Sequence, residues 1–387
     1  MKAPQFCPHK DCRYHGKERK PVIWYRSWGS YGTKAFGTVQ RYRCNGCGRT
    51  FSDQTFSLDY YVKKKVRYER VLEQIISAGG VRDTARQERY SASVVQNRTA
   101  RLARQAMAIQ ETLIQTVKLS EHLCADGFES FTVSQYFPEN INLLAGYSSQ
   151  MVYYANHVTI RRKGRMTVLQ KAKRDKMEEI YRAPRKGIQK AFEQVMHFTA
   201  YLMHSSSENE LLLITDKKKE YPRAIKAVEH IITHDGGSGY QLPLHHKTVN
   251  SKEPRTRWND LFAVNYLDRQ IRKDTANHVR ETVQFARNVN DGMNRLMVYF
   301  LQHNFRKPYR IRLEKQDPKT HGEVAGIDPV QIRKELSTLY SERRFYSHLE
   351  KISGTGEPGK FMRQLWKREL VTPMKRGKEY CPLYCVG

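Results

Sequence analysis

The sequence is poor in acidic residues. Its 387 residues include 39 Asp and Glu against 68 Lys and Arg, which leaves a formal net charge of +29. A compact chain with this charge repels itself, and the charge is sustained most readily beside a polyanion. The imbalance is far from that of an ordinary small-substrate enzyme and indicates nucleic acid or an anionic membrane as the partner.

Long hydrophobic runs are also absent. A helix that spans a bilayer needs about 20 apolar residues, whereas the longest runs here, such as residues 211–214, have the length of a strand. The chain starts without the apolar segment of a secretory leader. We therefore expect a cytoplasmic protein with no membrane partner. The hydrophobic content of 39% excludes a purely disordered basic tail.

Only seven cysteines are present, and in a leaderless chain of this length they do not indicate a disulfide framework. Four of them form two pairs, with Cys7 and Cys12 in CPHKDC and Cys44 and Cys47 in YRCNGCGRTF. Two such knuckles, joined by a stretch rich in Tyr, Trp and Gly, are typical of a zinc ribbon in which four thiolates bind one structural Zn²⁺. We predict this ribbon over residues 1–57.

Alternatives stay open for the cysteines. The two pairs are also compatible with buried thiols that hold no metal, and His9 or His15 would be a substitute ligand for one thiolate. A further pair, Cys381 and Cys385, lies at the C-terminal end. Because it has only two thiols, chance spacing or burial explains it better than a metal site.

Residues 58–110 are predicted to form three helices. A glycine pair at 79–80 ends the first helix, and a turn at 90–91 separates the second from the third. This is the layout of a helix-turn-helix, whose last helix enters the major groove. Residues 60–110 hold 11 basic and 4 acidic side chains, a net charge of +7. A plain helical hairpin with a solvated basic face is the alternative. The expected DNA-binding side chains are Ser93, Gln96, Asn97, Arg101 and Arg104.

Two aspartates follow short strand-like runs. The runs at 122–125 and 211–214 lead into Asp126 and Asp216. An aspartate just past a buried strand projects from a rigid sheet edge, and two such strands side by side can hold a divalent ion. We predict an α/β fold with a mixed-sheet catalytic core over residues 111–310, with Mg²⁺ or Mn²⁺ at these carboxylates. Taken singly, each aspartate would more often cap a helix or turn.

A third acid usually completes such a site, in which two ions activate the attacking oxygen and stabilise the leaving oxygen of a phosphoryl transfer. We expect residues 261–305 to be helical and choose Asp268 on this segment. An ion pair with Arg272, one turn later, is its alternative role. The rival acids are Glu253, Asp274 and Glu281.

The order of these modules resembles that of bacterial insertion-sequence transposases, which join an N-terminal zinc ribbon and a helix-turn-helix to an RNase H-like core with an Asp-Asp-Glu or Asp-Asp-Asp triad. The motif YRCNGCGRTF and residues 266–305 carry the resemblance. In the second stretch, an acid-Arg segment precedes an Arg-x-Thr-x-x-Phe element formed by Arg280, Thr282 and Phe285. The resemblance implies that Asp268 is the third catalytic acid, at a position where Glu is commoner.

By this resemblance, the chain would hydrolyse DNA at element ends to expose a 3′-hydroxyl and then join that hydroxyl to target DNA. Asp126, Asp216 and Asp268 would bind the magnesium ions, and Arg269 and Arg272 would hold phosphates. The ribbon and the helix-turn-helix would recognise terminal inverted repeats in double-stranded DNA. The resemblance also implies a homodimer or higher homo-oligomer, associated with the bacterial nucleoid.

Two other functions share these binding features. A catalytically inactive DNA-binding regulator would keep the core as a scaffold, and a structure-specific nuclease would cleave without joining. Charge alone would also permit RNA binding, but the predicted major-groove helix favours duplex DNA. Residues 311–387 are basic, with Gly and Pro punctuation, and are expected to form a C-terminal appendage of helices and loops.

Overall fold

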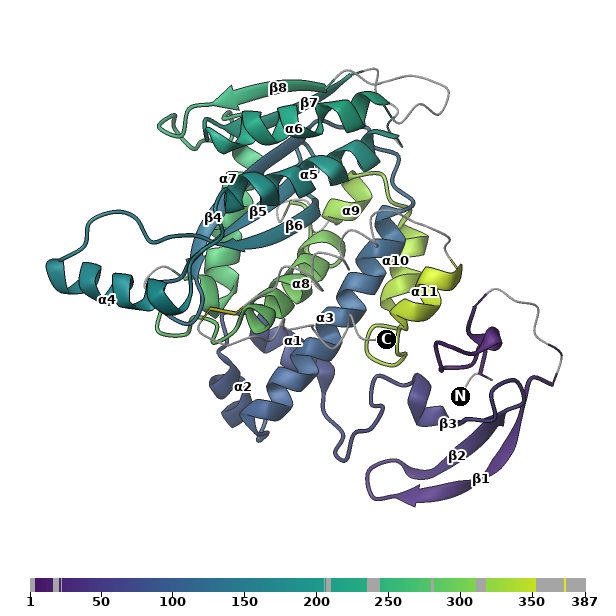
Figure 1. Cartoon of the computed structure of the whole chain (residues 1–387). Helices are drawn as coiled ribbons and strands as arrows, with labels where there is room; N and C mark the ends of the chain where they lie inside the picture. The colour runs from purple at the N-terminus through teal and green to yellow at the C-terminus, as the bar shows by residue number, and fades with distance from the viewer. Residues whose placement is uncertain are drawn as a thin grey trace.

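The fold is taken from a computed structural model, which describes residues 4–16, 21, 23–204, 206, 210–234, 244–279, 282–310, 318–352 and 372–373. Within these ranges the chain forms a small N-terminal sheet, a group of helices and a larger five-stranded sheet, in that order (Figure 1). The mixed α/β architecture predicted from the sequence is confirmed.

The N-terminal unit is an antiparallel sheet with its own small core. Its elements are η1 (Arg13–His15), β1 (Tyr25–Thr33), β2 (Gly37–Cys44), β3 (Thr50–Ser52) and η2 (Asp53–Phe56), with the sheet order β1-β2-β3. Trp24 and Phe51 stack with their ring centroids 5.7 Å apart, beside the buried Cys7, Cys12 and Cys44. So few buried residues supply little hydrophobic stabilisation, which makes a cross-link by metal valuable here.

The three helices predicted after the ribbon are present as α1 (Tyr68–Ile75), α2 (Val81–Gln87) and α3 (Ala92–Ile114). Ser91 caps α3 by accepting a hydrogen bond from the backbone N–H of Val94. From residue 101 to residue 111 every α3 side chain is buried, and the helix packs along α8 (Val289–Phe305). The three helices therefore share one continuous hydrophobic core with the large sheet.

The large sheet has the order β6-β5-β4-β7-β8. Its strands are β4 (Leu123–Phe131), β5 (Pro138–Gly146), β6 (Val152–Thr159), β7 (Leu211–Asp216) and β8 (Leu244–Val249). The first three are antiparallel neighbours, whereas β7 runs parallel to β4 and β8 runs parallel to β7. Every residue of β5 and β6 is buried, as expected for strands that are covered on both faces.

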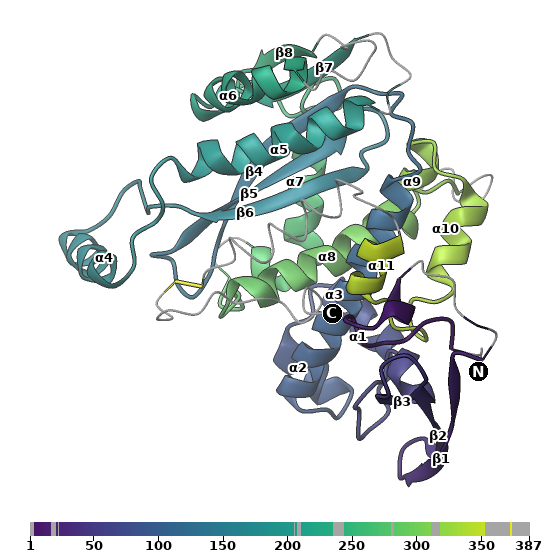
Figure 2. The same ribbon diagram turned by 45° about the vertical axis from the view of Figure 1, so that its right-hand side comes forward.

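Helices cover the two faces of this sheet. The helix α5 (Gly187–His204) packs against β5 and β6 and against α6 (Glu220–His234), and α7 (Phe262–Asp274) packs against β4 and β5 (Figures 1 and 2). Asn156 of β6 donates to the carbonyl of Ala191 in α5, whereas Leu143 of β5 lies at the cavity lined by Val264 of α7. The helix α4 (Val168–Ile180) has no buried residue and projects from the body (Figure 2).

The continuous helix predicted over 261–305 is wrong. The structure ends α7 at Asp274 and starts α8 at Val289, and η3 (Ala276–His278) lies between them. Thr275 adopts an extended backbone (φ −124°, ψ 117°) that terminates α7. Asn288 then caps α8 by accepting from the N–H of Asp291 at 2.8 Å. Apolar residues recur at helical spacing on both sides of the break, and this pattern predicted one continuous helix in spite of the helix end at Thr275 and the cap at Asn288.

The described part of the predicted C-terminal appendage is built into the body. It contains α9 (His321–Val324), α10 (Pro329–Leu336) and α11 (Tyr346–Ile352). The N–H of Leu58 donates to the carbonyl of Ser341 at 3.0 Å, and Phe6 stacks on His348 with the centroids 3.6 Å apart. Ile332 and Leu339 join the main core. The described part of this segment therefore contacts both the ribbon and the helical core.

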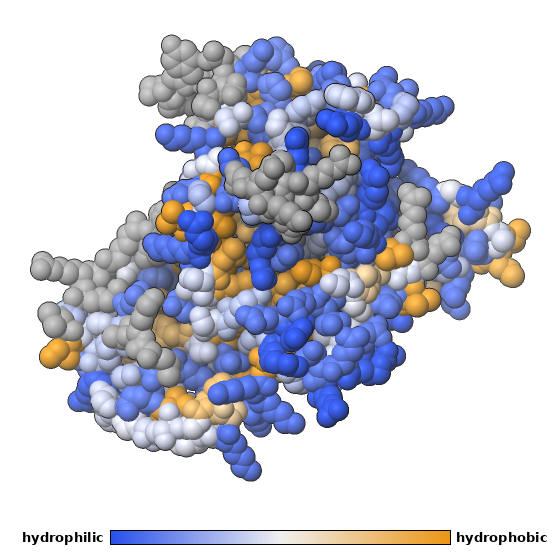
Figure 3. Space-filling model, turned by 180° about the vertical axis from the view of Figure 1, so that it is seen from behind, coloured by the Kyte–Doolittle hydropathy of each residue, from blue (hydrophilic) through white to orange (hydrophobic). Residues whose placement is uncertain are grey.

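The surface is mainly polar. Seen from behind, hydrophilic residues cover most of the molecule and hydrophobic ones form smaller patches between them (Figure 3). Among the described residues, no helix is long and apolar enough to cross a membrane.

The shared core predicts that the α3 helix and the large sheet unfold together. Leu102 is buried in α3, so Leu102→Ala should lower the free energy of unfolding by about 2–5 kcal/mol through lost burial and a cavity. Urea denaturation followed by circular dichroism should show one main transition that moves to lower urea. The control Ser93→Ala, at an exposed position of the same helix, should move it little. Two separate transitions, of which only one moves, would contradict the shared core.

Candidate functional site

The predicted thiolate cluster is formed. The Sγ atoms of Cys7 and Cys47 are 3.7 Å apart, as are those of Cys12 and Cys44, and all four lie within 4.8 Å of one another. A tetrahedral zinc with Zn–S bonds of about 2.3 Å requires sulfur atoms roughly 3.8 Å apart. The donor set and its spacing therefore fit a structural metal ion such as Zn²⁺.

Backbone groups prepare the thiolates for a cation. The N–H of Gly46 donates to Sγ of Cys44 at 3.3 Å, and the N–H of Tyr14 donates to Sγ of Cys12 at 3.4 Å. Burial raises the pKa of Cys44, but N–H groups of the second knuckle outweigh it and lower that pKa. Burial and the neighbouring thiolates raise the pKa of Cys7. A bound cation supplies the positive charge that lets all four thiols ionise.

The two histidines considered as substitute ligands have other partners. His15 is buried, with Nδ1 2.6 Å from the carbonyl of Cys7 and Nε2 2.9 Å from Oγ of Ser347. Nε2 of His9 lies 3.3 Å from the carbonyl of Thr50. The four-thiolate set is therefore the one that the structure brings together.

The three predicted acids line one cavity of about 260 Å³. Asp126 comes from β4, Asp216 from the end of β7 and Asp268 from α7. The parallel pairing of β4 with β7 matches Ala125 with Thr215, so the next residue on each strand is an aspartate at the same level of the sheet. Asp126 lies inside β4 and not just past it, because pairing with β5 continues that strand to residue 131.

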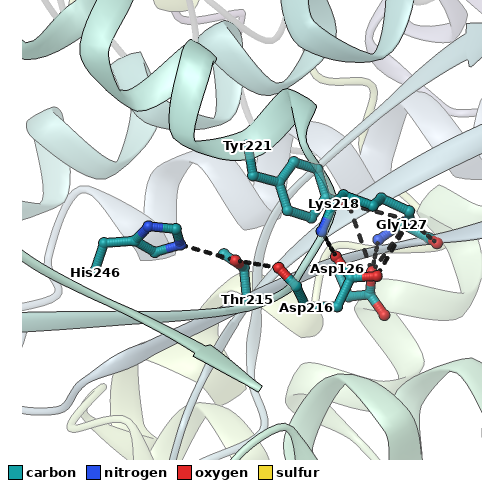
Figure 4. A network of polar contacts seen from close by, with 7 residues as sticks. All are labelled: Asp126, Gly127, Thr215, Asp216, Lys218, Tyr221 and His246. Carbon is teal, nitrogen blue, oxygen red and sulfur yellow. Dashed lines mark hydrogen bonds and ion pairs between the residues drawn. The ribbon is translucent and has the colours of Figure 1, made fainter. Parts of the chain in front are cut away.

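Lys218 and Tyr221 complete the acidic pair. The ammonium of Lys218 lies 3.4 Å from Oδ1 of Asp126 and 3.9 Å from Oδ2 of Asp216. The hydroxyl of Tyr221 donates to the same Oδ1 of Asp126 at 3.4 Å. Figure 4 shows both side chains directed at Asp126, while His246 contacts Thr215 on the other side of Asp216. The Lys218 ammonium thus lies beside the two carboxylates, where a metal cation bound by both would lie.

The sequence reading missed Lys218 and Tyr221. They stand two and five residues after Asp216, where the chain turns from β7 into α6. Lys218 belongs to a run of three lysines, and nothing in that run distinguishes the one that turns inward. Its backbone N–H donates to Oδ1 of Asp216 at 3.2 Å, which fixes the turn and directs the side chain to the cavity.

Asp268 is shared between the cavity and an ion pair. Nε of Arg272 donates to Oδ1 of Asp268 at 2.8 Å, as the alternative role predicted, and the same guanidinium donates to the carbonyl of Glu129 at 2.9 Å. A neighbouring cavity of about 280 Å³ is lined by Arg255, Arg269 and Arg272 together with Asp268. Cations thus gather beside the acids.

The rival acids lie elsewhere or outside the described residues. Oε1 of Glu253 accepts a hydrogen bond from the N–H of Asn250, and Asp274 pairs with Lys307 at 3.4 Å. Neither residue lines the cavity that Asp126, Asp216 and Asp268 share. Glu281 lies outside the described residues, as do Cys381 and Cys385.

The acids are not drawn together as closely as the thiolates. Within the described ranges, the four cysteines are the only group of three or more Cys, His, Asp or Glu whose ligand atoms lie close enough to hold a metal ion. Burial, and then the charge of Asp126, raise the pKa of Asp216, and Lys218 partly offsets this effect. Two carboxylates that repel each other across one cavity form a receptor for positive charge.

Of the α3 residues expected to contact DNA, only those near the start of the helix are exposed to solvent. Ser93 and Gln96 are exposed, although Nε2 of Gln96 reaches Asp291 at 3.2 Å. Oδ1 of Asn97 accepts from Nε of Arg101 at 3.0 Å. Arg101 and Arg104, also expected to bind DNA, are instead buried: they are 7% and 3% exposed and pack on the ring of Tyr60. The helical spacing of polar residues put both arginines on the same side of α3 as Ser93 and Gln96, but from residue 101 onward the core surrounds this helix.

Neither a protein-family model nor a curated protein matches this chain.

Zinc binding gives a direct test of the ribbon. Purified protein should hold one Zn²⁺ per chain by metal analysis, and Cys44→Ser should lose most of it, because three thiolates hold a structural ion far less tightly. His9→Ala, which changes a neighbour that is not a ligand, should keep the metal. An equal zinc content in Cys44→Ser and the parent protein would rule out this ligand set.

Removing one carboxylate charge from the acid cavity should stabilise the folded protein. The pKa of Asp216 in the folded protein is raised above its ordinary value of 3.8, so the protonated carboxyl stabilises the fold. This stabilisation is fully present below pH 3.8 and is lost as the pH rises through the folded-state pKa. At neutral pH, with no added Mg²⁺ or Mn²⁺, Asp216→Asn should therefore raise the Tm by roughly 2 °C in calorimetry. The advantage should shrink as the pH falls toward 3.8.

The matched control is Asp175→Asn. That carboxylate is more than half exposed and pairs with Arg174 at 2.8 Å. Its removal should change the Tm little or lower it slightly. A lower Tm for Asp216→Asn at neutral pH would show that Lys218 outweighs the repulsion between the two aspartates.

Proposed function

We propose that the protein is a DNA transposase that binds terminal inverted repeats and carries out metal-dependent strand cleavage and strand transfer. The observation that carries the proposal is the meeting of Asp126, Asp216 and Asp268 in one cavity from β4, β7 and α7. These residues are 90 and 52 positions apart along the chain. An arrangement that depends on two strands and a helix is less expected by chance than a cluster within one loop.

The rest of the chain supports this function. The sheet order β6-β5-β4-β7-β8, with an antiparallel half followed by two parallel strands, is compatible with the RNase H-like core that the resemblance implies. The thiolate cluster is compatible with a zinc ribbon. The net charge of +29 suits a polyanionic substrate.

Magnesium or manganese fits the donor set of the cavity. Asp126, Asp216 and Asp268 would hold the ions. The ammonium of Lys218 already lies beside two of these carboxylates, in the place of a metal ion. When bound, such ions lower the pKa of water and stabilise negative charge on the oxygens around phosphorus. For them to bind, Lys218 must move away from at least one carboxylate.

The protein's own cations would hold the substrate. Arg255, Arg269 and Arg272 line the cavity next to the acids, and Arg272 is oriented by Asp268 and by the carbonyl of Glu129. Guanidinium groups bind phosphate oxygens in pairs and fix the direction of the scissile bond. In hydrolysis, water attacks phosphorus and the P–O3′ bond breaks to leave a 3′-hydroxyl. In transfer, that hydroxyl attacks a target phosphate and releases a new 3′-hydroxyl.

A catalytically inactive DNA-binding regulator is the second candidate. It is favoured by the wider separation of the acids, which do not converge as the four thiolates do, and by the ammonium beside two of them. In that protein Lys218 would permanently neutralise the pair. A nuclease without strand transfer would share the acid cavity and would differ only in its products. The homo-oligomer that brings two DNA ends together is likewise part of the proposal.

The test is a cleavage and joining assay on DNA that carries the native flanks of the gene, with Mg²⁺ or Mn²⁺. Asp126→Asn, Asp216→Asn and Asp268→Asn should each lower cleavage by more than roughly 100-fold, because even outer-shell changes at metal sites cost up to that factor. Each variant should still bind the DNA, since none removes a cation. Asp175→Asn should cleave like the parent protein.

Different outcomes separate the candidates. Sequence-specific binding without cleavage in either metal would favour the regulator. Cleavage without joined product would favour the nuclease. Full activity of Asp268→Asn would remove this residue from the triad.

A further inference from the structure

A cavity larger than the one shared by the three acids lies beside it and has no role in the function proposed above. Its volume is about 830 Å³, within the range of small-molecule and nucleotide pockets. It is formed where the turn between β5 and β6, the start of α7, the loop before α7 and the segment after α8 meet. The residues that characterise it are Tyr147, Arg257, Phe262, Tyr266, Tyr309 and Arg310.

The lining combines aromatic rings with guanidinium groups. The rings of Phe262 and Tyr266 stack with their centroids 5.8 Å apart, and Tyr309 is held by its hydroxyl, which donates to the carbonyl of Ser148 at 2.8 Å. Arg257 and Arg310 add positive charge, and no described residue of the lining is acidic. Two acids outside the lining contact it: Glu121 accepts from the N–H of Ser148 at 2.9 Å, and Asp260 accepts from the hydroxyl of Tyr147 at 3.4 Å and pairs with Lys247 at 2.7 Å.

This pocket and the acid cavity share the helix α7. Phe262, Ala263 and Tyr266 face the large pocket, whereas Val264, Asn265 and Asp268 face the acids. The loop before α7 connects them in the same way, since Arg255 lines the acid cavity and Arg257 lines the large pocket. Trp258, the next residue of this loop after Arg257, is 81% exposed. A strand held at the acids would therefore find aromatic rings and further cations on the adjoining surface.

We infer that this pocket binds an unpaired nucleotide of the substrate DNA strand, with its base stacked on the aromatic side chains and its phosphate held by Arg257 and Arg310. The inference rests on the proposed function. Stacking on a protein ring requires a base face that is free of its neighbours, which a paired base within a duplex does not offer. Every base has such a face, so the pocket would accept the nucleotide with little sequence preference.

The test compares a blunt duplex with the same duplex carrying one unpaired nucleotide, using the full chain without added Mg²⁺ or Mn²⁺. The parent protein should bind the second DNA about tenfold more tightly by fluorescence anisotropy, within the range expected for stacking of one base. 2-Aminopurine at the unpaired position should be quenched on binding, because it stacks on the aromatic rings.

Three substitutions give the test its controls. Tyr147→Ala should remove most of the preference for the unpaired nucleotide, while Tyr147→Phe should keep it because the ring remains. Arg257→Gln, at an exposed position, should weaken the same preference. Tyr61→Ala removes a ring that is 89% exposed and lies outside the pocket, and should change nothing.

The outcomes distinguish this inference from the function on which it rests. Equal binding of the two duplexes, or a preference unchanged in Tyr147→Ala and Arg257→Gln, would overturn the pocket's role and leave DNA binding intact. Failure to bind either duplex would overturn both. If a free mononucleotide such as dAMP bound as tightly as the DNA and lost its binding in Tyr147→Ala, the pocket would belong to a free nucleotide and not to the DNA strand.

Discussion

The candidate site depends on the pairing of β4 with two different partners. Its antiparallel pairing with β5 keeps β4 extended through residue 131, and its parallel pairing with β7 brings Asp216 to the level of Asp126. Parallel strands need a long connection, and here β5, β6, α4 and α5 lie between β4 and β7 in the chain. If the register of β4 and β7 shifted by one residue, one aspartate would face the opposite side of the sheet. The acid pair is therefore a property of the sheet and not of either strand.

The same strand pairing brings two negative charges close together. Two carboxylates lie side by side in a partly buried cavity, where burial, and then repulsion by Asp126, raise the pKa of Asp216. Lys218 partly neutralises them from the adjoining turn, and Arg272 does so for Asp268. Sites that keep unfavourable charge in place commonly do so because a ligand of opposite charge completes them.

Positive charge is divided between structural and solvent-facing roles. Arg101 and Arg104 stack on Tyr60 in the interior, and Arg295 is buried beside Asn277. Guanidinium groups tolerate such positions because their flat faces stack on aromatic rings and their N–H groups reach carbonyls. A count of basic residues thus overstates the positive charge that faces solvent. The arginines near α7, by contrast, line cavities.

The sequence by itself determined the thiolate set, the three helices after it and the strands that carry Asp126 and Asp216. These features depend on local spacing, capping and short apolar runs, which act within a few residues. The tertiary structure alone decided that α3 is buried beyond its first turns and that residues 318–352 join the ribbon to the core. It also decided which of three adjacent lysines turns inward as Lys218. Burial and inward orientation depend on segments distant in the chain, so local patterns do not encode them.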